Sequence, residues 1–111
     1  MARVLIVEPE PDLLLFVQEA VRELGHEALL FDESDAGVSV DVLLVAAHAG
    51  MTALVCRLRR AHAGLPVICA GTLPPGPEAR ALAPVAYLIK PYTLGDLDRA
   101  LVKAITTART R

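Results

Sequence analysis

The sequence has few of the residues that build metal centres, disulfide scaffolds or aromatic-rich surfaces. Its 111 residues include no tryptophan, and aromatic residues make up 4% of the chain. Cys56 and Cys69 do not have the spacing of a metal-binding or redox motif, so we expect each to be a small buried hydrophobe. His26, His48 and His62 are equally dispersed and predict no metal cluster.

A strong charge of one sign and long apolar runs are also missing. The net charge is −2, and the densest basic group, Arg57, Arg59 and Arg60, is typical of a solvated helix face. No apolar run approaches the ~18 residues of a membrane span, and Val4–Val7 is too short for a signal-peptide core. We therefore expect a cytoplasmic protein without a nucleic-acid or membrane partner.

What the chain does have is apolar residues, at 54% against 22% charged residues, with a mean hydropathy of +0.47. This length and composition predict one stand-alone domain with a single core, at residues 1–106, followed by a short basic tail at 107–111 that frays. The apolar surplus also predicts an exposed hydrophobic patch around the proline-rich segment Leu73–Pro77 and the last helix, suited to a homodimer or to a partner helix.

Strand and helix patterns alternate along the chain. Short aliphatic runs predict strands at Arg3–Val7, Ala28–Phe31, Val42–Ala46, Pro66–Ala70 and Val85–Ile89. Apolar residues at helical spacing predict helices at Pro11–Leu24 and Met51–His62, a short helix from about Glu78, and a last helix after Thr93. The alternation predicts a parallel sheet with helices on both faces and right-handed crossovers.

Helix ends and helix-poor segments are marked as well. Gly25 is placed to end the first helix in a left-handed conformation, and Thr93 with Asp96 forms a capping-box pattern. Asp32–Gly37 is acidic and turn-rich, with little room for a helix. Leu73–Pro77 contains three prolines and a glycine, so the helix that follows it is expected to be clipped.

The carboxyl ends of the predicted strands are where such a fold collects its ligands. The first strand is followed by Glu8-Pro9-Glu10-Pro11, with neither a GxGxxG nor a P-loop pattern. Pro9 and Pro11 lack the backbone N–H groups that a phosphate needs. The sequence therefore predicts neither a nucleotide nor a flavin, and we expect no cofactor.

Four segments occur in register along nearly the whole chain. They are Val4–Asp12, Asp41–Ala46, Leu65–Ile68 and Tyr87–Tyr92, the last of which carries the specific Tyr-x-x-Lys-Pro element. Together they resemble the receiver domains of bacterial two-component response regulators. The resemblance implies a flavodoxin-like, doubly wound α/β fold with a five-stranded parallel sheet in the order 2-1-3-4-5. The second and fourth helices of that family are expected to be shortened or irregular here.

Members of that family hold Mg²⁺ with an acidic pair after the first strand, and an aspartate that ends their third strand takes a phosphoryl group from a histidine kinase. By this resemblance Glu8 falls on the first acid, Pro9 on the second and Ala46 on the acceptor. A proline side chain cannot ligate a metal ion, and a methyl group cannot form an acyl phosphate. We expect no metal site, with Glu8 and Glu10 as weak candidates for one.

The remaining positions of the expected pocket are mixed. Gly71 falls on the family's hydroxyl position and Thr72 comes one residue late, although a bulge could still present it. Lys90 matches the family's lysine, and three roles stay open for it: an ion pair with Glu8, which we favour, a phosphate ligand, or a solvated side chain. The Lys90-Pro91 bond is a candidate for the cis form.

The resemblance therefore implies an atypical receiver, a pseudo-receiver and not an enzyme, that binds proteins independently of phosphorylation. Its partner would be a kinase, a regulator, an effector or a second copy of the chain. Candidates for the output surface are Tyr87, Tyr92, Leu94 and Asp98, with a half-buried role for Tyr87 equally open.

The alternative is a phosphoryl-accepting or metal-binding receiver that uses substitute residues. Glu8, Glu10 and Thr72 are the candidates for such a site, and His48, two residues beyond the lost acceptor, is a further candidate for phosphorylation. Two carboxylates without a third anchor make a weak Mg²⁺ site, and this alternative is the less favoured one.

Overall fold

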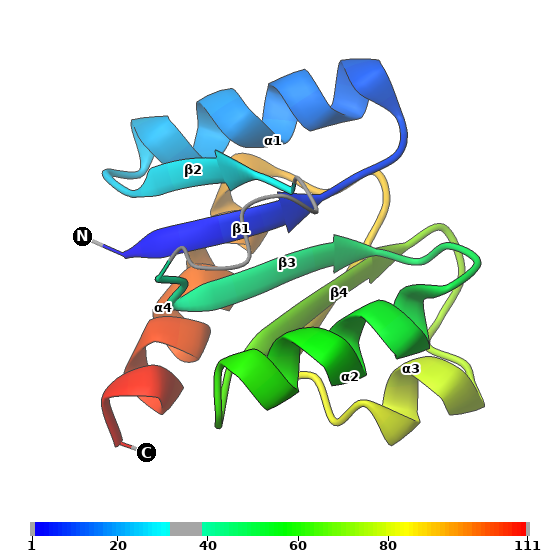
Figure 1. Cartoon of the computed structure of the whole chain (residues 1–111). Coiled ribbons are helices and arrows are strands. Elements are labelled where there is room, and N and C mark those ends of the chain that lie inside the picture. Colours follow the sequence, from blue (N-terminus) through cyan, green and yellow to red (C-terminus); the bar gives the residue numbers. More distant parts are fainter. Residues whose placement is uncertain (1, 32–38, 111) are drawn as a thin grey trace.

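The computed structural model describes residues 2–31 and 39–110. Within these residues, strands and helices alternate as in Figure 1. Their bounds are β1 Arg3–Val7, α1 Pro11–Glu23, β2 Glu27–Leu30, β3 Val42–Ala46, α2 Met51–Ala61, β4 Val67–Gly71, α3 Pro77–Ala81, β5 Ala86–Ile89 and α4 Leu94–Thr110. Each strand therefore lies within one residue of its predicted start and end.

The strands form one parallel sheet in the order β2-β1-β3-β4-β5. The order confirms the predicted doubly wound α/β fold. β3 and β4 lie inside the sheet, and every one of their residues is buried, because helices cover both faces of these strands. β2 and β5 form the two edges, and most of their residues are only partly buried.

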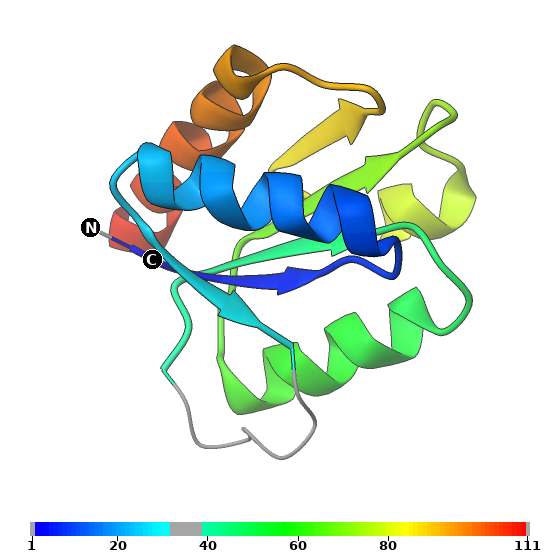
Figure 2. The same cartoon turned by 90° about the horizontal axis from the view of Figure 1, so that it is seen from above.

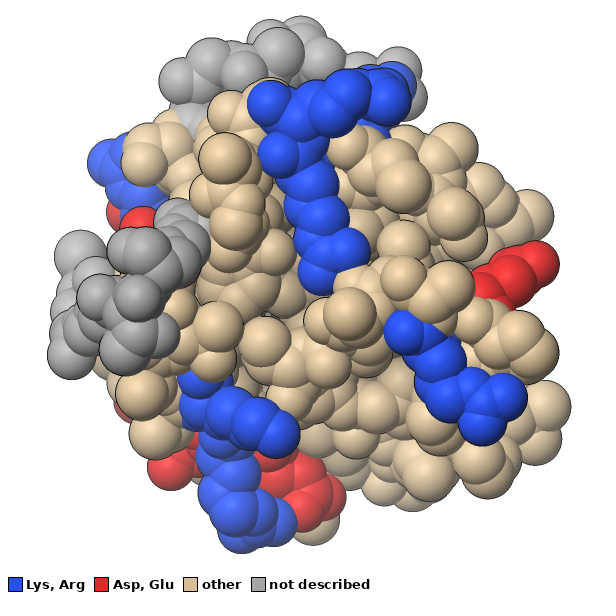
Figure 3. Space-filling model, turned by 90° about the horizontal axis from the view of Figure 1, so that it is seen from below, with Lys and Arg blue, Asp and Glu red and all other residues tan. Residues whose placement is uncertain are grey.

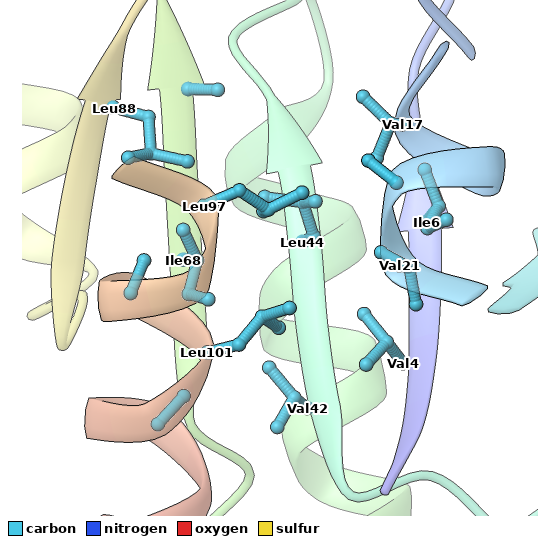
Figure 4. Close-up of a cluster of buried hydrophobic side chains, with 14 of the residues drawn as sticks. Val4, Ile6, Val17, Val21, Val42, Leu44, Ile68, Leu88, Leu97 and Leu101 are labelled. Atoms are coloured by element: carbon cyan, nitrogen blue, oxygen red, sulfur yellow. The ribbon is translucent and has the colours of Figure 1, made fainter. Parts of the chain in front are cut away.

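One face of the sheet is covered by α1 and α4, as Figure 2 shows. Aliphatic side chains of both helices meet those of the strands in a continuous core (Figure 4). Val21 of α1 and Leu101 of α4 are fully buried in it, together with Val4 and Ile68 of the sheet. Burial of this apolar surface is the main force that holds the two helices on the sheet.

The other face is covered by α2 and α3, which pack on a second core. Val55 of α2 and Leu43 and Val67 of the sheet are fully buried there. The short α3 contributes one buried residue, Ala79. α3 has 5 residues, which confirms the expected clipping of the helix after the proline-rich segment. The expected shortening of the helix between β2 and β3 concerns Asp32–Gly37, which lies outside the described residues.

Local signals at the helix ends act as predicted. Pro11 is the first residue of α1, and Gly25 follows that helix with a φ of 90°. Thr93 and Asp96 form the capping box: the Thr93 N–H donates to the Asp96 carboxylate at 3.0 Å, and the Asp96 N–H donates to the Thr93 hydroxyl at 3.1 Å. These bonds hold the pKa of Asp96 below its usual value.

Two expectations change in the structure. Cys69 is buried as predicted, and burial raises the pKa of its thiol, but the prediction for Cys56 is wrong because that side chain is exposed on α2. Cys56 lies off the face of α2 that is buried on the sheet through Met51 and Val55. α4 runs on to Thr110, so residues 107–110, expected as a tail, are helical. No helix in the described part of the chain has the length and apolarity of a membrane-spanning segment.

Candidate functional site

The predicted pocket residues meet where the strands end, at the carboxyl ends of β1, β3, β4 and β5. We call this end of the sheet its carboxyl edge. Val45 pairs with Val7 on one side and with Cys69 on the other, so Ala46 follows between Glu8 and Ala70. Gly71 pairs with Ile89, and the Lys90 N–H donates to the Gly71 carbonyl at 2.8 Å. The carboxyl ends of β1, β3 and β4 therefore point to the same side of the parallel sheet (Figure 1).

Glu8 and Lys90 form an ion pair at the centre of this edge. The Lys90 Nζ lies 2.8 Å from Oε1 of Glu8, and the exposed fractions of the two side chains are 18% and 4%. The other carboxylate oxygen, Oε2, accepts the Glu10 N–H at 3.2 Å. The predicted ion pair is confirmed, and both oxygens of the Glu8 carboxylate already have a partner within the chain.

The residues at this edge do not fit the Mg²⁺ ion of the receiver family. Mg²⁺ needs several oxygen ligands at short, nearly octahedral distances. Pro9 supplies no ligand, Ala46 supplies a methyl group, and the Glu8 carboxylate is turned to the Lys90 ammonium. Across residues 2–31 and 39–110, no three His, Cys, Asp or Glu side chains are grouped so that they could hold a metal ion.

The position of the phosphoacceptor carries no nucleophile. Ala46 is 3% exposed and ends β3. His48 is half-buried in the exposed loop that follows, and its Nδ1 lies 2.7 Å from the Ala46 carbonyl oxygen. Because a carbonyl only accepts hydrogen bonds, Nδ1 carries a proton and Nε2 is the nitrogen with the lone pair when the ring is neutral. This hydrogen bond to the backbone two residues earlier fixes the orientation of the imidazole ring.

The hydroxyl position of the family is filled by a different side chain. Gly71 ends β4, and a Cβ atom added there would collide with the hydroxyl of Tyr87. That hydroxyl donates to the Leu73 carbonyl at 2.9 Å, so Tyr87 takes up the space beside Gly71 and ties down the following loop. β4 pairs regularly through Gly71, and Thr72 lies beyond the strand with an exposed side chain.

The four residues predicted for the output surface differ in their exposure. Leu94 and Asp98 are exposed on α4 and Tyr87 is half-buried, but Tyr92 is 8% exposed and faces Phe16, with 6.3 Å between the ring centroids. The interpretation of Tyr92 as a surface anchor is therefore wrong. Burial, and then the charge of Glu8, raise the pKa of Tyr92 to about 12. Tyr92 belongs to the core between the sheet, α1 and α4. The Lys90-Pro91 bond, a candidate for the cis form, is cis.

A shallow groove of ≈ 390 Å³ lies between β5 and α4. Asp96, Arg99 and Lys103 of α4 supply its charges, and Tyr87 and Ile89 of β5 supply its apolar side. Sequence reasoning missed this arrangement, since the two elements meet only in the folded chain.

Comparison with known proteins gives a match in structure alone. No family model matches the chain, and no curated protein matches it. A response regulator receiver domain protein from Clostridium thermocellum superimposes with a TM-score of 0.79 at 19% identity, over 99% of this chain and 98% of that one. The signal receiver domain of a modulated diguanylate cyclase from Desulfovibrio desulfuricans G20 gives a TM-score of 0.82 at 24% identity, over 99% and 98%.

The receiver domain of the sensor histidine kinase PA1611 from Pseudomonas aeruginosa PAO1, which has a magnesium ion coordinated in its active-site cleft, gives a TM-score of 0.81 at 18% identity, over 95% and 98%. The chain therefore has the fold of a receiver domain over nearly its whole length. At these identities the likeness concerns the fold, and function has to be argued from the chain's own residues.

Proposed function

We propose that this receiver-fold domain acts in two-component signal transduction as a protein-binding module that does not depend on phosphorylation. The observation that carries the proposal is the carboxyl edge of the sheet, where Ala46 replaces the acceptor and the Glu8 carboxylate is bound to Lys90. An acyl phosphate requires a carboxylate nucleophile, and its transfer requires a metal ion to offset the phosphoryl charge. Neither requirement is met by the residues at this edge.

The changes at this edge support one another. Pro9 removes the second metal ligand, and Gly71 removes the hydroxyl that would contact the phosphoryl group. Tyr87 occupies the space that such a side chain would need, and Lys90 neutralises Glu8. A single lost residue is more easily replaced than several, so together these changes favour a binding role over an altered phosphotransfer reaction.

The partner is a protein of the same signalling system: a kinase, a regulator, an effector or a second copy of the chain. The domain is no enzyme in this proposal and acts in the cytoplasm. Its signal is delivered through contact, because the proposed role has no chemical step of its own.

The decisive experiment measures whether the edge of the sheet binds Mg²⁺ or a phosphoryl mimic. In an amide NMR titration with Mg²⁺ and then beryllofluoride, we expect no saturable shifts at Glu8, Ala46 or Lys90. Saturable shifts there, or at Glu10, His48 or Thr72, would contradict the proposal and favour a receiver that uses substitute residues.

Introducing an aspartate at position 46 gives a second test of the proposal. Ala46→Asp alone should not be labelled by acetyl phosphate, because Pro9 and the Lys90-bound Glu8 leave the metal site incomplete. The double variant Ala46→Asp/Pro9→Asp supplies the two missing carboxylates and should be labelled faster than the single variant. Rapid labelling of Ala46→Asp alone, measured by intact-protein mass spectrometry, would show that the edge of the sheet is still competent.

A further inference from the structure

Within residues 2–31 and 39–110, the face of the sheet that carries α2 is incompletely covered on the side of β2. Among the described residues, Val7, Leu29 and Phe31 pack against the second core but stay only partly buried. In β3 and β4 the corresponding strand residues are buried throughout. A parallel sheet normally has helices over both faces, so the partly buried apolar side chains mark a place where another element would fit.

A groove of ≈ 530 Å³ runs along α2 at this place. It is lined by Val7, Phe31, His48, Gly50, Ala53, Leu54, Arg57 and Arg60. The lining residues of α2 and of the position before it recur every three or four residues, so they lie along one side of the helix. From Gly50 to Arg60 the groove is about 15 Å long, at 1.5 Å per helical residue.

The groove has an apolar floor and a basic end. Val7, Phe31 and Leu54 are half-buried and supply the floor, whereas the side chains of Arg57 and Arg60 are exposed. In Figure 3, which looks onto the side of α2 and α3, basic side chains cross the middle of the surface and acidic ones lie toward its margins. An occupant therefore needs apolar side chains along its length and negative charge beside Arg60, near the carboxyl end of α2.

We infer that this groove is the docking site for an amphipathic, acidic α-helix of the partner protein, an inference that rests on the proposed function and gives its partner a chemistry. Helices pack 8–10 Å apart on a shared sheet face, and a helix of about ten residues matches a groove of this length. Apolar side chains at i, i+3, i+4 and i+7 would cover Phe31 and Leu54. Aspartate or glutamate on the flank would pair with Arg60.

Two adjacent residues of α2 provide a matched pair for the test. Ala53 and Thr52 are both exposed, but only Ala53 lines the groove. A photo-crosslinking amino acid is placed at position 53 or 52 of the full chain in its native cells, and at Val102 of α4 as a second control. The crosslinked partner segments are then identified by mass spectrometry.

We expect position 53 to capture a segment that is acidic and has helical apolar spacing, and position 52 to capture it several-fold less. A synthetic peptide of that segment should bind the purified chain in fluorescence anisotropy. Arg60→Glu should weaken this binding roughly tenfold, and raised salt should weaken it further. The matched reversal Arg22→Glu, on the opposite face, should leave the affinity unchanged.

Other outcomes overturn the inference in distinguishable ways. Capture of a basic or non-helical segment at position 53 would contradict the chemistry of the occupant. Capture at Val102 without capture at position 53 would reject the groove but keep the proposed function, with the partner on α4. If no position captured a protein, both the groove and the binding role would lose their support. Beryllofluoride binding would reject the independence from phosphorylation, and the crosslinks at position 53 would still decide whether the groove binds a helix.

Discussion

The two faces of the sheet are covered to different extents. α1 and α4, with 13 and 17 residues, cover one face, and their buried side chains form the larger core. On the other face α2 has 11 residues and α3 has 5. The first core contains 15 buried residues and the second contains 11, and partly buried apolar side chains border both. We therefore expect the first face to contribute more to stability, and the proposed docking groove lies on the second.

The carboxyl edge of the sheet differs from both faces. There the chain has an ion pair of low exposure, Glu8 with Lys90, and a tyrosine, Tyr87, hydrogen-bonded across a glycine. These contacts occupy the positions at which a receiver would bind a metal ion and a phosphoryl group. These contacts also contribute to the stability of the fold. Three substitutions and one pH dependence compare the free energies of unfolding that the first core, the carboxyl edge and the amino end of β1 contribute.

The largest effect is expected in the core under α1 and α4. Leu101→Ala removes a fully buried side chain of α4 and should lower the free energy of unfolding by roughly 3–5 kcal/mol. Leu58→Ala, a half-buried residue of α2, is the matched control and should cost about 1–2 kcal/mol, because less apolar surface is lost. Urea-induced unfolding measures both, and equal losses would contradict the difference between the faces.

The ion pair at the carboxyl edge comes second. Lys90→Met leaves the Glu8 carboxylate, 4% exposed, without its cation, and should cost about 3 kcal/mol, at the lower end of the range for buried pairs since Lys90 keeps some solvent. Adding Glu8→Gln removes the unpaired charge, so the double variant should recover most of the loss. Additive losses in this double-mutant cycle would show that the two side chains are not coupled.

The contact between Gly71 and Tyr87 comes third. Gly71→Ala brings a methyl group onto the Tyr87 hydroxyl and should cost about 1–3 kcal/mol through overpacking. In a Tyr87→Phe background the hydroxyl is absent and the cost should shrink. Gly76→Ala is the control, because nothing lies within 4 Å of a Cβ atom at that position. Chemical unfolding measures these losses. An equal loss of unfolding free energy with and without the Tyr87 hydroxyl would show that contact with this hydroxyl does not cause the loss.

The smallest effect is a pH dependence at the amino end of β1. The Ala2 N–H donates to Nδ1 of His26 at 3.2 Å, which requires that nitrogen to be unprotonated. Burial, and then the charge of the amino terminus, lower the pKa of His26 below 6.5, and the charge of Asp98 opposes them. A lowered pKa means that the unfolded chain binds the proton more tightly.

Stability should therefore be complete above pH 6.5 and decline as the pH falls through the lowered pKa of His26. Unfolding measured between pH 7.5 and pH 5 checks this, and His26→Gln should flatten the profile over that interval. An unchanged profile in the variant would assign the dependence to other groups.

Much of the fold was predictable because its signals are local. Apolar runs located the strands to within one residue, and Thr93 with Asp96 marked the start of α4 through contacts three residues apart. The pair of Glu8 and Lys90 spans the chain, yet it was predictable because the ends of parallel strands meet at one edge.

The errors fall where a residue's environment depends on how elements meet. Cys56 and Tyr92 are both apolar in character, but Cys56 lies on the outer side of α2 and Tyr92 lies under Phe16 of α1. The groove along α2 was not predicted either, since Phe31 and Arg60 come from elements that are far apart in the sequence.

By itself, the sequence determined the order of the elements, the parallel sheet and the alanine at the end of β3, because each depends on residue type and short-range spacing. Only the tertiary structure decided that Tyr87 fills the space beside Gly71, that Tyr92 is buried and that an apolar groove with arginines at one end runs beside α2. The physical reason is that burial and cavities are properties of pairs of surfaces. They exist only once helices and strands from separate parts of the chain are in contact.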